Sequence, residues 1–384
     1  MVDVTAPLRT AVIGTGFVGP FHVDAARRSG LADVVVLAGS NPDRTATRAR
    51  SLGVPKATTD VDDVLSDRDV DVVHVCTPND SHVDLARRAL QAGKHVVVEK
   101  PLALSLGDAT ELARLAASSG RHAMVAFTYR GYPMIRRARQ LVGDGELGAL
   151  RLIHGAYLQD WLANETDYNW RLEPASGASR AVADIGSHWV DTAEYVSGIR
   201  VGAVLADFAT FMTSRLRPAT AAAAFESSTG ESEEVPIASE DAATILLRFD
   251  DGSRGAVVIS QVSPGRKNAF GFEIAGSKAS LAWEQERPES LWIGSRSETR
   301  RLHREPDVVS TGVPSLPAGH PEGWAEALRD VLRPFYAAIA GGESPSTDGS
   351  PMPYPTLADG VRAVAVVEAI VASARSGRWT EPAG

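Results

Sequence analysis

The chain has 384 residues, of which 39 are Lys or Arg and 48 are Asp or Glu, so its formal net charge is −9 at neutral pH. This acidic balance argues against nucleic-acid binding and against attachment to an anionic membrane, because no basic stripe is present to neutralise phosphates. A hydrophobic fraction of 44% and a single cysteine, Cys76, are typical of a globular protein without an internal disulfide. With no basic leader before an apolar run and no apolar run of about 18 residues, we expect a soluble, cytoplasmic protein of about two or three domains.

The first third of the chain alternates short apolar segments with helical ones. Continuous Val and Ile runs between helices are typical of parallel strands that are covered on both faces. The sequence therefore predicts an α/β fold that begins with a doubly wound parallel sheet. Strands are expected at 9–13, 34–38, 70–76, 95–98 and 122–127, and helices at about 17–28, 42–52, 80–91 and 106–118.

The turn after the first expected strand contains a G-x-G-x-x-G sequence that leads into a helix. In this context Gly14 permits the tight turn, Gly16 lets the backbone approach a pyrophosphate, and Gly19 lets the helix pack on the strand. The start of the helix, with Phe17 and Val18 just before it, offers unpaired N–H groups and a positive dipole end to phosphates. We therefore expect the turn to bind a dinucleotide rather than to be an empty glycine-rich loop.

The end of the second expected strand bears on the choice between NAD and NADP. An acidic side chain there would bind the ribose 2′-hydroxyl of NAD, but the segment at 39–41 reads Gly-Ser-Asn and holds no carboxylate. Beside Asn41, Ser40 could donate to a 2′-phosphate and Arg44 could pair with it. This favours NADP slightly. The alternative is that Arg44 is a solvated helix charge, while Ser40 and backbone groups hold the ribose of NAD.

Two further strand ends carry polar residues. Glu99 and Lys100 follow the fourth expected strand, and Thr77, Pro78 and Asn79 follow the third. Because ligands bind at the carboxyl edge of open α/β sheets, both segments should border the nicotinamide. Lys100 could donate a proton or hold a substrate hydroxyl, and a lysine that merely ends a strand at the surface is the alternative.

Asp184 and His188 lie four residues apart in the sequence Asp-Ile-Gly-Ser-His. On a helix this spacing places both side chains on one face, where they could bind substrate hydroxyls and move a proton. An aspartate at a helix start and a packed histidine are the alternative. Metal ligation by His188 with Asp184 or Asp191 is disfavoured, because no further His or Cys lies at a useful spacing.

Together, the glycine-rich turn, the Glu-Lys-Pro near residue 100 and the Asp-x-Gly-x-His resemble the Gfo/Idh/MocA family, the group of glucose-fructose oxidoreductase and inositol dehydrogenase. The combination is far more specific than any one part, and the resemblance covers nearly the whole chain. It also implies that the Lys100–Pro101 peptide bond is cis. The other matching segments are 77–82, which contains the candidate cofactor residue His82, 89–101, 145–148 and 359–363.

The resemblance implies an N-terminal Rossmann domain that binds NAD(P), set at residues 1–127. It implies a substrate-binding and oligomerisation domain at 128–384, of α/β class with a large, open, mostly antiparallel sheet. Lys100, Asp184 and His188 match the family's catalytic positions. In that reading His188 is the acid and base that takes the proton from the substrate hydroxyl, which Lys100 and Asp184 orient.

The pattern changes after residue 150, where about six antiparallel strands are expected. A sheet of this size with one face bare of helices commonly packs against a second copy, so we expect a homodimer or a homotetramer. The final helix could pack back on the Rossmann domain. The expected strands are 150–157, 204–211, 243–249, 254–260, 270–275 and 280–284, with a mobile hairpin loop at 217–235, loops at 305–320 and 341–355 that could shape the pocket mouth, and the final helix at about 356–374.

Aromatic and polar residues gather in the loop after the first of these strands. Apolar sugar faces stack on aromatic rings while hydroxyls take hydrogen bonds, so Trp161 and Trp170 suit a polyol site. Packing of both tryptophans in the core is the alternative. The candidate substrate residues are Tyr129, Arg130, Tyr157, Trp161, Trp170 and Arg171.

These features predict an NAD(P)-dependent oxidoreductase that moves a hydride between the nicotinamide and a secondary alcohol or ketone of a sugar, glycoside or cyclitol. One alternative keeps the cofactor bound through a redox cycle with a transient keto-sugar. Another is a non-catalytic NAD(P)-binding sensor, which the presence of Lys100, Asp184 and His188 together disfavours. The sequence does not identify the sugar or the physiological direction.

Overall fold

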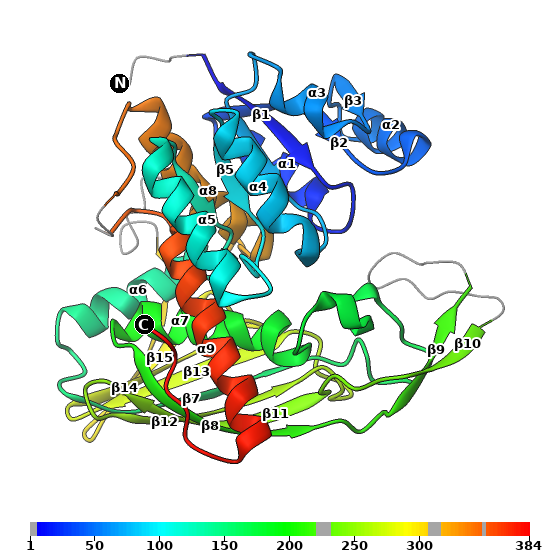
Figure 1. Ribbon diagram of the computed structural model, residues 1–384. Coiled ribbons are helices and arrows are strands. Elements are labelled where there is room, and N and C mark those ends of the chain that lie inside the picture. The colour runs from blue at the N-terminus through cyan, green and yellow to red at the C-terminus, as the bar shows by residue number, and fades with distance from the viewer. Residues whose placement is uncertain (1–5, 220–231, 306–315, 348–350) are drawn as a thin grey trace. The chain divides into compact units, whose positions relative to one another are not determined.

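The computed structural model describes residues 6–219, 232–305, 316–347 and 351–384, and it divides the chain into two compact units (Figure 1). The first unit is Met1–Gly131 with Trp324–Arg362, and the second is Tyr132–Gly323 with Ala363–Gly384. The expected domain boundary after residue 127 remains a prediction. The first compact unit runs to Gly131, and it also includes a late segment of the chain.

The first unit is built on a six-stranded parallel sheet with the strand order β3-β2-β1-β4-β5-β6, which confirms the predicted doubly wound fold. The inner strands are valine-rich and almost completely buried, as expected for parallel strands covered on both faces. The register sets Ile13 level with Val75, and Val75 level with Val98, so these strands end along one carboxyl edge. The strands are β1 (Leu8–Ile13), β2 (Ala32–Ala38), β3 (Lys56–Thr58), β4 (Val72–Val75), β5 (His95–Val98) and β6 (Ala123–Val125).

Local sequence signals set the helix ends of the first unit. The side chain of Asn41 caps α2 by accepting the N–H of Arg44 at 2.9 Å, and Pro42 occupies the first helical position. Ser105 caps α5 in the same way, and Gly120 ends that helix in the left-handed conformation with φ 65°. The helices of this part are α1 (Gly19–Arg28), α2 (Pro42–Ser51), α3 (Val61–Leu65), η1 (Asn79–Ser81), α4 (His82–Gln91), α5 (Leu106–Ser119) and η2 (Thr128–Gly131).

The late segment of the first unit contains α8 (Trp324–Ala340), which the sequence reading did not predict. Its inner face joins the core of the parallel sheet, where Leu328, Phe335 and Tyr336 are fully buried in one cluster with valines of β1 and β4. The ring of Trp324 meets Phe21 of α1 edge-on, with centroids 5.2 Å apart. An amphipathic pattern can predict a helix but not the sheet that it covers.

The last helix, α9 (Leu357–Ser376), is divided between the units at Arg362. Its first turn lies close to the parallel sheet, since a Cβ at Gly360 would be 2.7 Å from Cγ2 of Val125. Later in the helix, Ser373 Oγ accepts the N–H of Ala206 at 3.1 Å within the second unit. The first turn and the rest of this helix thus belong to different units.

The second unit is built on an eight-stranded sheet with the strand order β16-β15-β14-β13-β7-β12-β11-β8. β7 and β12 pair in parallel and the other neighbouring pairs are antiparallel, which confirms a large, mostly antiparallel sheet. The strands are β7 (Leu150–Leu158), β8 (Val201–Ala209), β11 (Ala242–Phe249), β12 (Arg254–Ser260), β13 (Ala269–Gly276), β14 (Ala279–Glu284), β15 (Ser290–Ser295) and β16 (Thr299–His303), with β9 (Ser214–Pro218) and β10 (Ser232–Pro236) as a separate ladder. The helices are α6 (Pro133–Gly143), η3 (Trp170–Leu172), η4 (Pro174–Ser176), the π-helical turn η5 (Val182–Gly186) and α7 (Ser187–Ser197).

Two sequence expectations for this sheet were wrong. The count of about six strands was too low, because β15 and β16 were missed; β16 reads Thr-Arg-Arg-Leu-His, is mostly exposed and lacks an apolar strand pattern. The expected loop at 217–235 has strands at its ends, since β9 and β10 pair there, and its central residues 220–231 lie outside the described residues. Parts of the loops expected at 305–320 and 341–355 also lie outside them, at 306–315 and 348–350.

One face of the sheet packs against helices and the other exposes apolar side chains. On the packed face Trp189 of α7 is fully buried, and its Nε1–H donates to the carbonyl oxygen of Gly271 at 3.0 Å. On the opposite face Leu152, Leu246 and Val258 share one side of three adjacent strands, and about 40% of each side chain is exposed. Among the helices of the described residues, none is long and apolar enough to cross a membrane.

Candidate active site

In the glycine-rich turn of the first unit, two of the three glycines have no room for a side chain and the third faces open space. Gly14 has φ 124°, and a Cβ there would be 2.3 Å from the carbonyl oxygen of Cys76. A Cβ at Gly19 would be 2.1 Å from the carbonyl oxygen of Gly14, so both positions exclude any other residue. A Cβ at Gly16 would meet nothing within 4 Å, which leaves the backbone there open to a ligand.

The start of α1 completes this turn. Val18 is the N-cap residue and no side chain caps the helix, so the positive end of the helix dipole is available to an anion. Phe17, next to it, is 51% exposed, and its ring lies 5.3 Å from that of Phe21. The open backbone at Gly16 beside an uncapped helix start fits the pyrophosphate of a dinucleotide.

At the end of β2 no carboxylate can be accommodated at position 39. A Cβ at Gly39 would be 2.5 Å from Oγ1 of Thr45 and 2.7 Å from Cγ2 of Thr15. Ser40 and Arg44 are exposed beside it, whereas Asn41 is engaged in capping α2. The residues present can therefore meet a ribose or a 2′-phosphate with a hydroxyl and a guanidinium, but not with an acid at this glycine.

The ends of β4 and β5 are tied together by His82. Its Nδ1 lies 2.8 Å from the carbonyl oxygen of Pro101, and its Nε2 lies 2.9 Å from that of Thr77. Burial lowers the pKa of His82, and because both partners are acceptors, a neutral ring donates to one of them at a time. The ring thus joins the two segments that carry Thr77, Pro78 and Asn79 on one side and Glu99 and Lys100 on the other, and its contact with a cofactor stays a prediction.

Lys100 lies at the carboxyl edge of the parallel sheet, directly after β5, and is half-buried. The Lys100–Pro101 bond is cis, as the family resemblance implied. Glu99 before it is 8% exposed; its Oε1 lies 2.9 Å from Nε2 of His22, and its Oε2 accepts the backbone N–H of Lys100 at 3.2 Å. The side chain of Glu99, next to the candidate catalytic lysine, is therefore held in place by the buried ring of His22.

Two candidate substrate residues, Tyr129 and Arg130, lie in the first unit. Tyr129 is 2% exposed. Arg130 pairs with Asp359 at 2.8 Å, and its guanidinium lies over the ring of Phe127 at 5.6 Å. Burial opposes the charge on Asp359, but Arg130 and the hydrogen bonds from Thr356 together outweigh it, and the pKa of Asp359 is lowered overall. A substrate role for either residue stays a prediction.

In the second unit the structure brings Asp184 together with Arg171 and Gln261. Asp184 lies in the π-helical turn η5, where its Oδ1 is 3.2 Å from Nε of Arg171 and its Oδ2 accepts from Nε2 of Gln261 at 2.8 Å. His188 follows in the first turn of α7 and is 9% exposed. Sequence reasoning missed Gln261, which lies just after β12 and carries no local motif. Both carboxylate oxygens of Asp184 are thus fixed one turn ahead of His188.

A buried charge cluster supports the turn that carries Asp184. Glu240 accepts from Ser179 Oγ at 2.6 Å and from the backbone N–H groups of Arg180 and Val182, each at 3.0 Å. Its neighbour Asp241 pairs with the guanidinium of Arg180. The polar side chains of this cluster, those of Ser179, Arg180, Glu240 and Asp241, are no more than 5% exposed. No local motif predicts this cluster, because its members are scattered from residue 179 to residue 241.

The aromatic loop separates into two groups. Trp170 lies under the guanidinium of Arg171 at 4.5 Å, on the side of Asp184. Trp161 instead packs against the small apolar cluster around Leu162, and its Nε1–H donates to Gln159 Oε1 at 2.9 Å. The hydroxyl of Tyr157 donates to Asn268 Oδ1 at 2.7 Å, and Tyr157 is 3% exposed. Trp170 thus shares a partner, Arg171, with Asp184.

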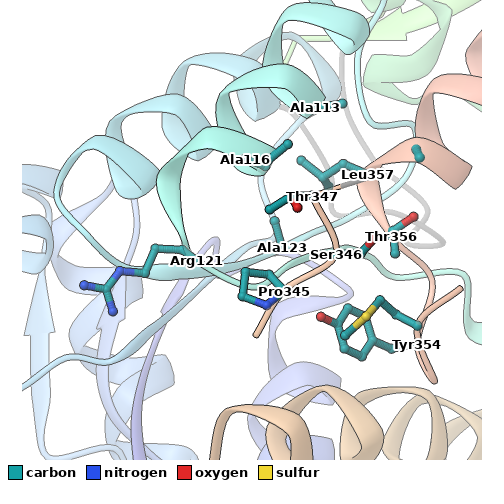
Figure 2. Close-up of a pocket in the computed structure, with 13 residues that line it drawn as sticks. Ala113, Ala116, Arg121, Ala123, Pro345, Ser346, Thr347, Tyr354, Thr356 and Leu357 are labelled. Atoms are coloured by element: carbon teal, nitrogen blue, oxygen red, sulfur yellow. The ribbon is translucent and has the colours of Figure 1, made fainter. Parts of the chain in front are cut away.

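Figure 2 shows a pocket of the first unit with a volume of about 110 Å³. It lies between α5 and the segment that leads into α9, and its lining is largely apolar, with Ala116, Met352 and Leu357 among the residues that form it. None of the predicted site residues lines it. Within the described residues, no group of three or more His, Cys, Asp or Glu side chains is arranged to hold a metal ion.

Comparison with known proteins gives matches along most of the chain. A family model described as an oxidoreductase family with an NAD-binding Rossmann fold matches residues 8–127, and a model of the GFO/IDH/MocA C-terminal domain matches residues 135–282. Levoglucosan dehydrogenase of Pseudarthrobacter phenanthrenivorans is 32% identical, over 97% of this chain and 98% of the relative.

Two solved structures show the same similarity in three dimensions. Levoglucosan dehydrogenase in complex with NADH and levoglucosan matches with a TM-score of 0.88 at 28% identity, covering 99% of this chain and 100% of that one. An inositol dehydrogenase homologue from Azotobacter vinelandii in complex with NAD+ matches with a TM-score of 0.83 at 28% identity, covering 99% and 98%.

Proposed function

Because the chain belongs to the Gfo/Idh/MocA family of NAD-binding oxidoreductases, we propose that it moves a hydride between a nicotinamide and a secondary alcohol or ketone of a sugar, glycoside or cyclitol. The observation that carries this proposal is the Asp184 carboxylate, which Arg171 and Gln261 fix one turn ahead of His188. In a chain of this family, an oriented carboxylate beside a histidine suits a substrate hydroxyl that must be held and deprotonated.

The cofactor would be held by the first unit. The backbone at Gly16 and the start of α1 would hold the pyrophosphate, and the segments after β4 and β5 would border the nicotinamide. When bound, the nicotinamide accepts or donates the hydride, while the protein supplies binding, orientation and the proton.

For the adenosine ribose, this chain's own residues favour NADP. Gly39 leaves no room for the carboxylate that would select NAD, and exposed Ser40 and Arg44 suit a 2′-phosphate. The relatives solved with NADH or NAD+ are reason to compare both cofactors directly. If Arg44 pairs with the phosphate, Arg44→Ala should weaken NADP about tenfold more than NAD. Equal effects on both cofactors would remove this assignment.

In the proposed mechanism His188 takes the proton from the substrate hydroxyl during oxidation and returns it during reduction. Asp184 and Lys100 orient that hydroxyl. Because both oxygens of Asp184 already accept from Arg171 and Gln261, its carboxylate is suited to orienting rather than to exchanging the proton.

For the substrate we propose a cyclic sugar. The Trp170 ring with Arg171 stacked on it offers an apolar face beside a charged donor, which matches the alternating CH and OH surfaces of a pyranose. Trp161 and Tyr157 would lie farther from the sugar than Trp170, because each already donates a hydrogen bond to a polar side chain of the second unit. Levoglucosan, the anhydro-sugar named for the relative at 32% identity, is therefore a first compound to test.

We also propose that the protein is a homodimer or a homotetramer. The exposed side chains of Leu152, Leu246 and Val258 lie on the helix-free face of the large sheet, where a second copy would cover them. Light scattering of the purified protein tests this, and a monomer at micromolar concentration would contradict it.

The catalytic assignment is tested by two variants. His188→Ala and Lys100→Ala should each lower kcat by about 10²-fold while NADH still binds, because neither side chain belongs to the glycine-rich turn that would hold the pyrophosphate. NADH fluorescence measures the binding and nicotinamide absorbance the turnover. Near-normal turnover in either variant would refute the role assigned to that residue.

A further inference from the structure

Four buried polar side chains of the first unit form one continuous row beneath Lys100. Glu99 Oε1 lies 2.9 Å from His22 Nε2, His22 Nδ1 lies 2.8 Å from His74 Nδ1, and His74 Nε2 lies 2.7 Å from the hydroxyl of Tyr336. The four residues come from four elements: the end of β5, α1, β4 and α8. His22, His74 and Tyr336 are 0% exposed and Glu99 is 8% exposed, so the row is shielded from bulk water except at its Glu99 end.

The hydrogen bonds along the row can donate in one of two directions, toward Glu99 or toward Tyr336. Burial lowers the pKa of His74 well below its ordinary value and raises that of Tyr336, so the first is a neutral imidazole and the second a phenol. Because the two Nδ1 atoms face each other, one of them carries a proton and the other accepts it. If Tyr336 donates to His74 Nε2, then His74 Nδ1–H donates to His22, and His22 Nε2–H donates to the carboxylate of Glu99.

The reverse direction fits the distances less well. In that direction His22 Nδ1–H donates to His74, so Nε2 of His22 either faces a protonated Glu99 or carries a second proton as an imidazolium, and Tyr336 is left to donate to Oγ1 of Thr10. That oxygen is 3.4 Å away, whereas O–H···O bonds are commonly about 2.7–2.8 Å. The short contact to His74 therefore favours the direction in which Tyr336 is the first donor.

We propose that His22, His74 and Tyr336 are positioning residues for Lys100: they hold Glu99 as a fixed hydrogen-bond acceptor, and its second oxygen holds the backbone of Lys100. In this last step Glu99 Oε2 accepts the backbone N–H of Lys100 at 3.2 Å. The inference rests on the proposed function, because it takes Lys100 as the residue that orients the substrate hydroxyl.

This arrangement explains why α8 belongs to the unit that carries the glycine-rich turn. Tyr336 supplies the first proton of the row from α8, and His22 lies on α1, whose N-terminus would hold the cofactor phosphates. A misplacement of a catalytic group by about 1 Å can lower turnover 10²-fold. Loss of the Tyr336 hydroxyl should therefore reach Lys100 through His74, His22 and Glu99.

The test compares two tyrosines with the same local chemistry. Tyr354, like Tyr336, is a buried residue of the first unit, and its hydroxyl lies 2.5 Å from Nδ1 of the buried His122. The other ring nitrogen of His122 meets the carbonyl oxygen of Glu343 at 2.9 Å, so this pair does not lead to Lys100. Tyr354→Phe is thus a matched control for Tyr336→Phe.

We expect Tyr336→Phe to lower kcat about tenfold or more, with the Kd for NADH within about threefold of wild type, and Tyr354→Phe to leave kcat within about twofold. Both variants should lose similar thermal stability. Glu99→Gln should lower kcat as well, and it serves if Tyr336→Phe does not fold. Unchanged turnover in Tyr336→Phe or in Glu99→Gln, or equal losses in both tyrosine variants, would overturn the proposal.

Histidine tautomers give a readout that is independent of turnover. Long-range ¹H–¹⁵N spectra of protein labelled at its nine histidines should show His74 protonated at Nδ1 and His22 at Nε2, and Tyr336→Phe should change this pattern while Tyr354→Phe should not. A wild-type His22 protonated at Nδ1 alone would overturn the proposal. If no sugar is turned over but the tautomers are as expected, it is the proposed function that fails and not the direction of the row.

Discussion

Removing Asp241 should destabilise the second unit more than any surface change, because Asp241 is the common partner of two buried guanidiniums. Its Oδ1 pairs with Arg180 and, at 3.1 Å, with Arg215, and its Oδ2 accepts the backbone N–H groups of Phe211 and Met212 at 2.7 and 2.9 Å. The side chains of Asp241 and Arg215 are 0% exposed and that of Arg180 is 1% exposed. Asp241→Ala would leave two cations and two N–H groups buried without this acceptor.

The expected loss of stability in Asp241→Ala follows from the two buried ion pairs. Taking one partner from a buried ion pair commonly costs about 3–5 kcal/mol, and here one carboxylate serves two cations, so we expect a loss at or above that range. For a unit of this size, about 2–4 °C of Tm is lost per kcal/mol, which gives a fall of about 6–20 °C. Burial opposes the charge on Asp241, but the Met212 N–H and the Arg180 guanidinium outweigh it and lower the pKa of Asp241.

Differential scanning calorimetry of Asp241→Ala measures the expected shift, with Glu146→Ala as the control. Glu146 pairs with Arg300 at 3.3 Å in the same unit, but the two side chains are 45% and 59% exposed, so its loss should cost no more than about 1 kcal/mol. A fall in Tm for Asp241→Ala no larger than that for Glu146→Ala would refute the view that the buried cluster supports the turn of Asp184.

Three further predictions concern pH, the glycine-rich turn and the candidate carboxylate. Burial lowers the pKa of His95 from 6.5 to about 4. Between these two pH values the unfolded chain binds a proton at His95 more readily than the folded chain does. The free energy of unfolding is therefore unaffected by this group above pH 6.5 and falls as the pH is lowered toward 4. His95→Asn keeps an acceptor without this titration, so it should flatten that part of the Tm curve against pH; an unchanged curve would contradict this. Gly14→Ala should cost at least about 1–3 kcal/mol by urea unfolding, whereas Gly16→Ala should keep wild-type stability and weaken NADH binding about tenfold, and equal stability losses would contradict the geometry of the turn. Gln261→Met removes a donor from Asp184 and should lower kcat about tenfold with little change in the Kd for NADH; wild-type turnover would show that this contact is dispensable.

Much of the first unit could be predicted because its signals are local. Valine runs set the parallel strands, Asn41 and Ser105 cap helices at their own first turns, and glycines mark the tight turn after β1. The order of these signals along the chain also placed Lys100 at the carboxyl edge of the sheet. Such features need only a few neighbouring residues, and the sequence displays them directly.

What could not be predicted depends on residues far apart in the chain. Tyr336 lies 262 residues beyond His74, its hydrogen-bond partner, and a histidine in an apolar strand reads as an ordinary core residue. Gln261 lies 77 residues beyond Asp184 and has no motif of its own. A helical pattern also does not distinguish a π-helical turn from an α-helix, because the two differ by one residue in their hydrogen-bond spacing.

We propose that this chain oxidises a cyclic sugar with His188 as the base. The most direct measurement is nicotinamide absorbance with the purified protein, NAD and NADP in parallel, against levoglucosan, inositols, aldoses and glycosides. We expect reduced nicotinamide with at least one cyclic compound, and a loss of about 10²-fold in His188→Ala with the cofactor still bound. No reduction with any compound although the cofactor binds, or equal rates in wild type and His188→Ala, would contradict it.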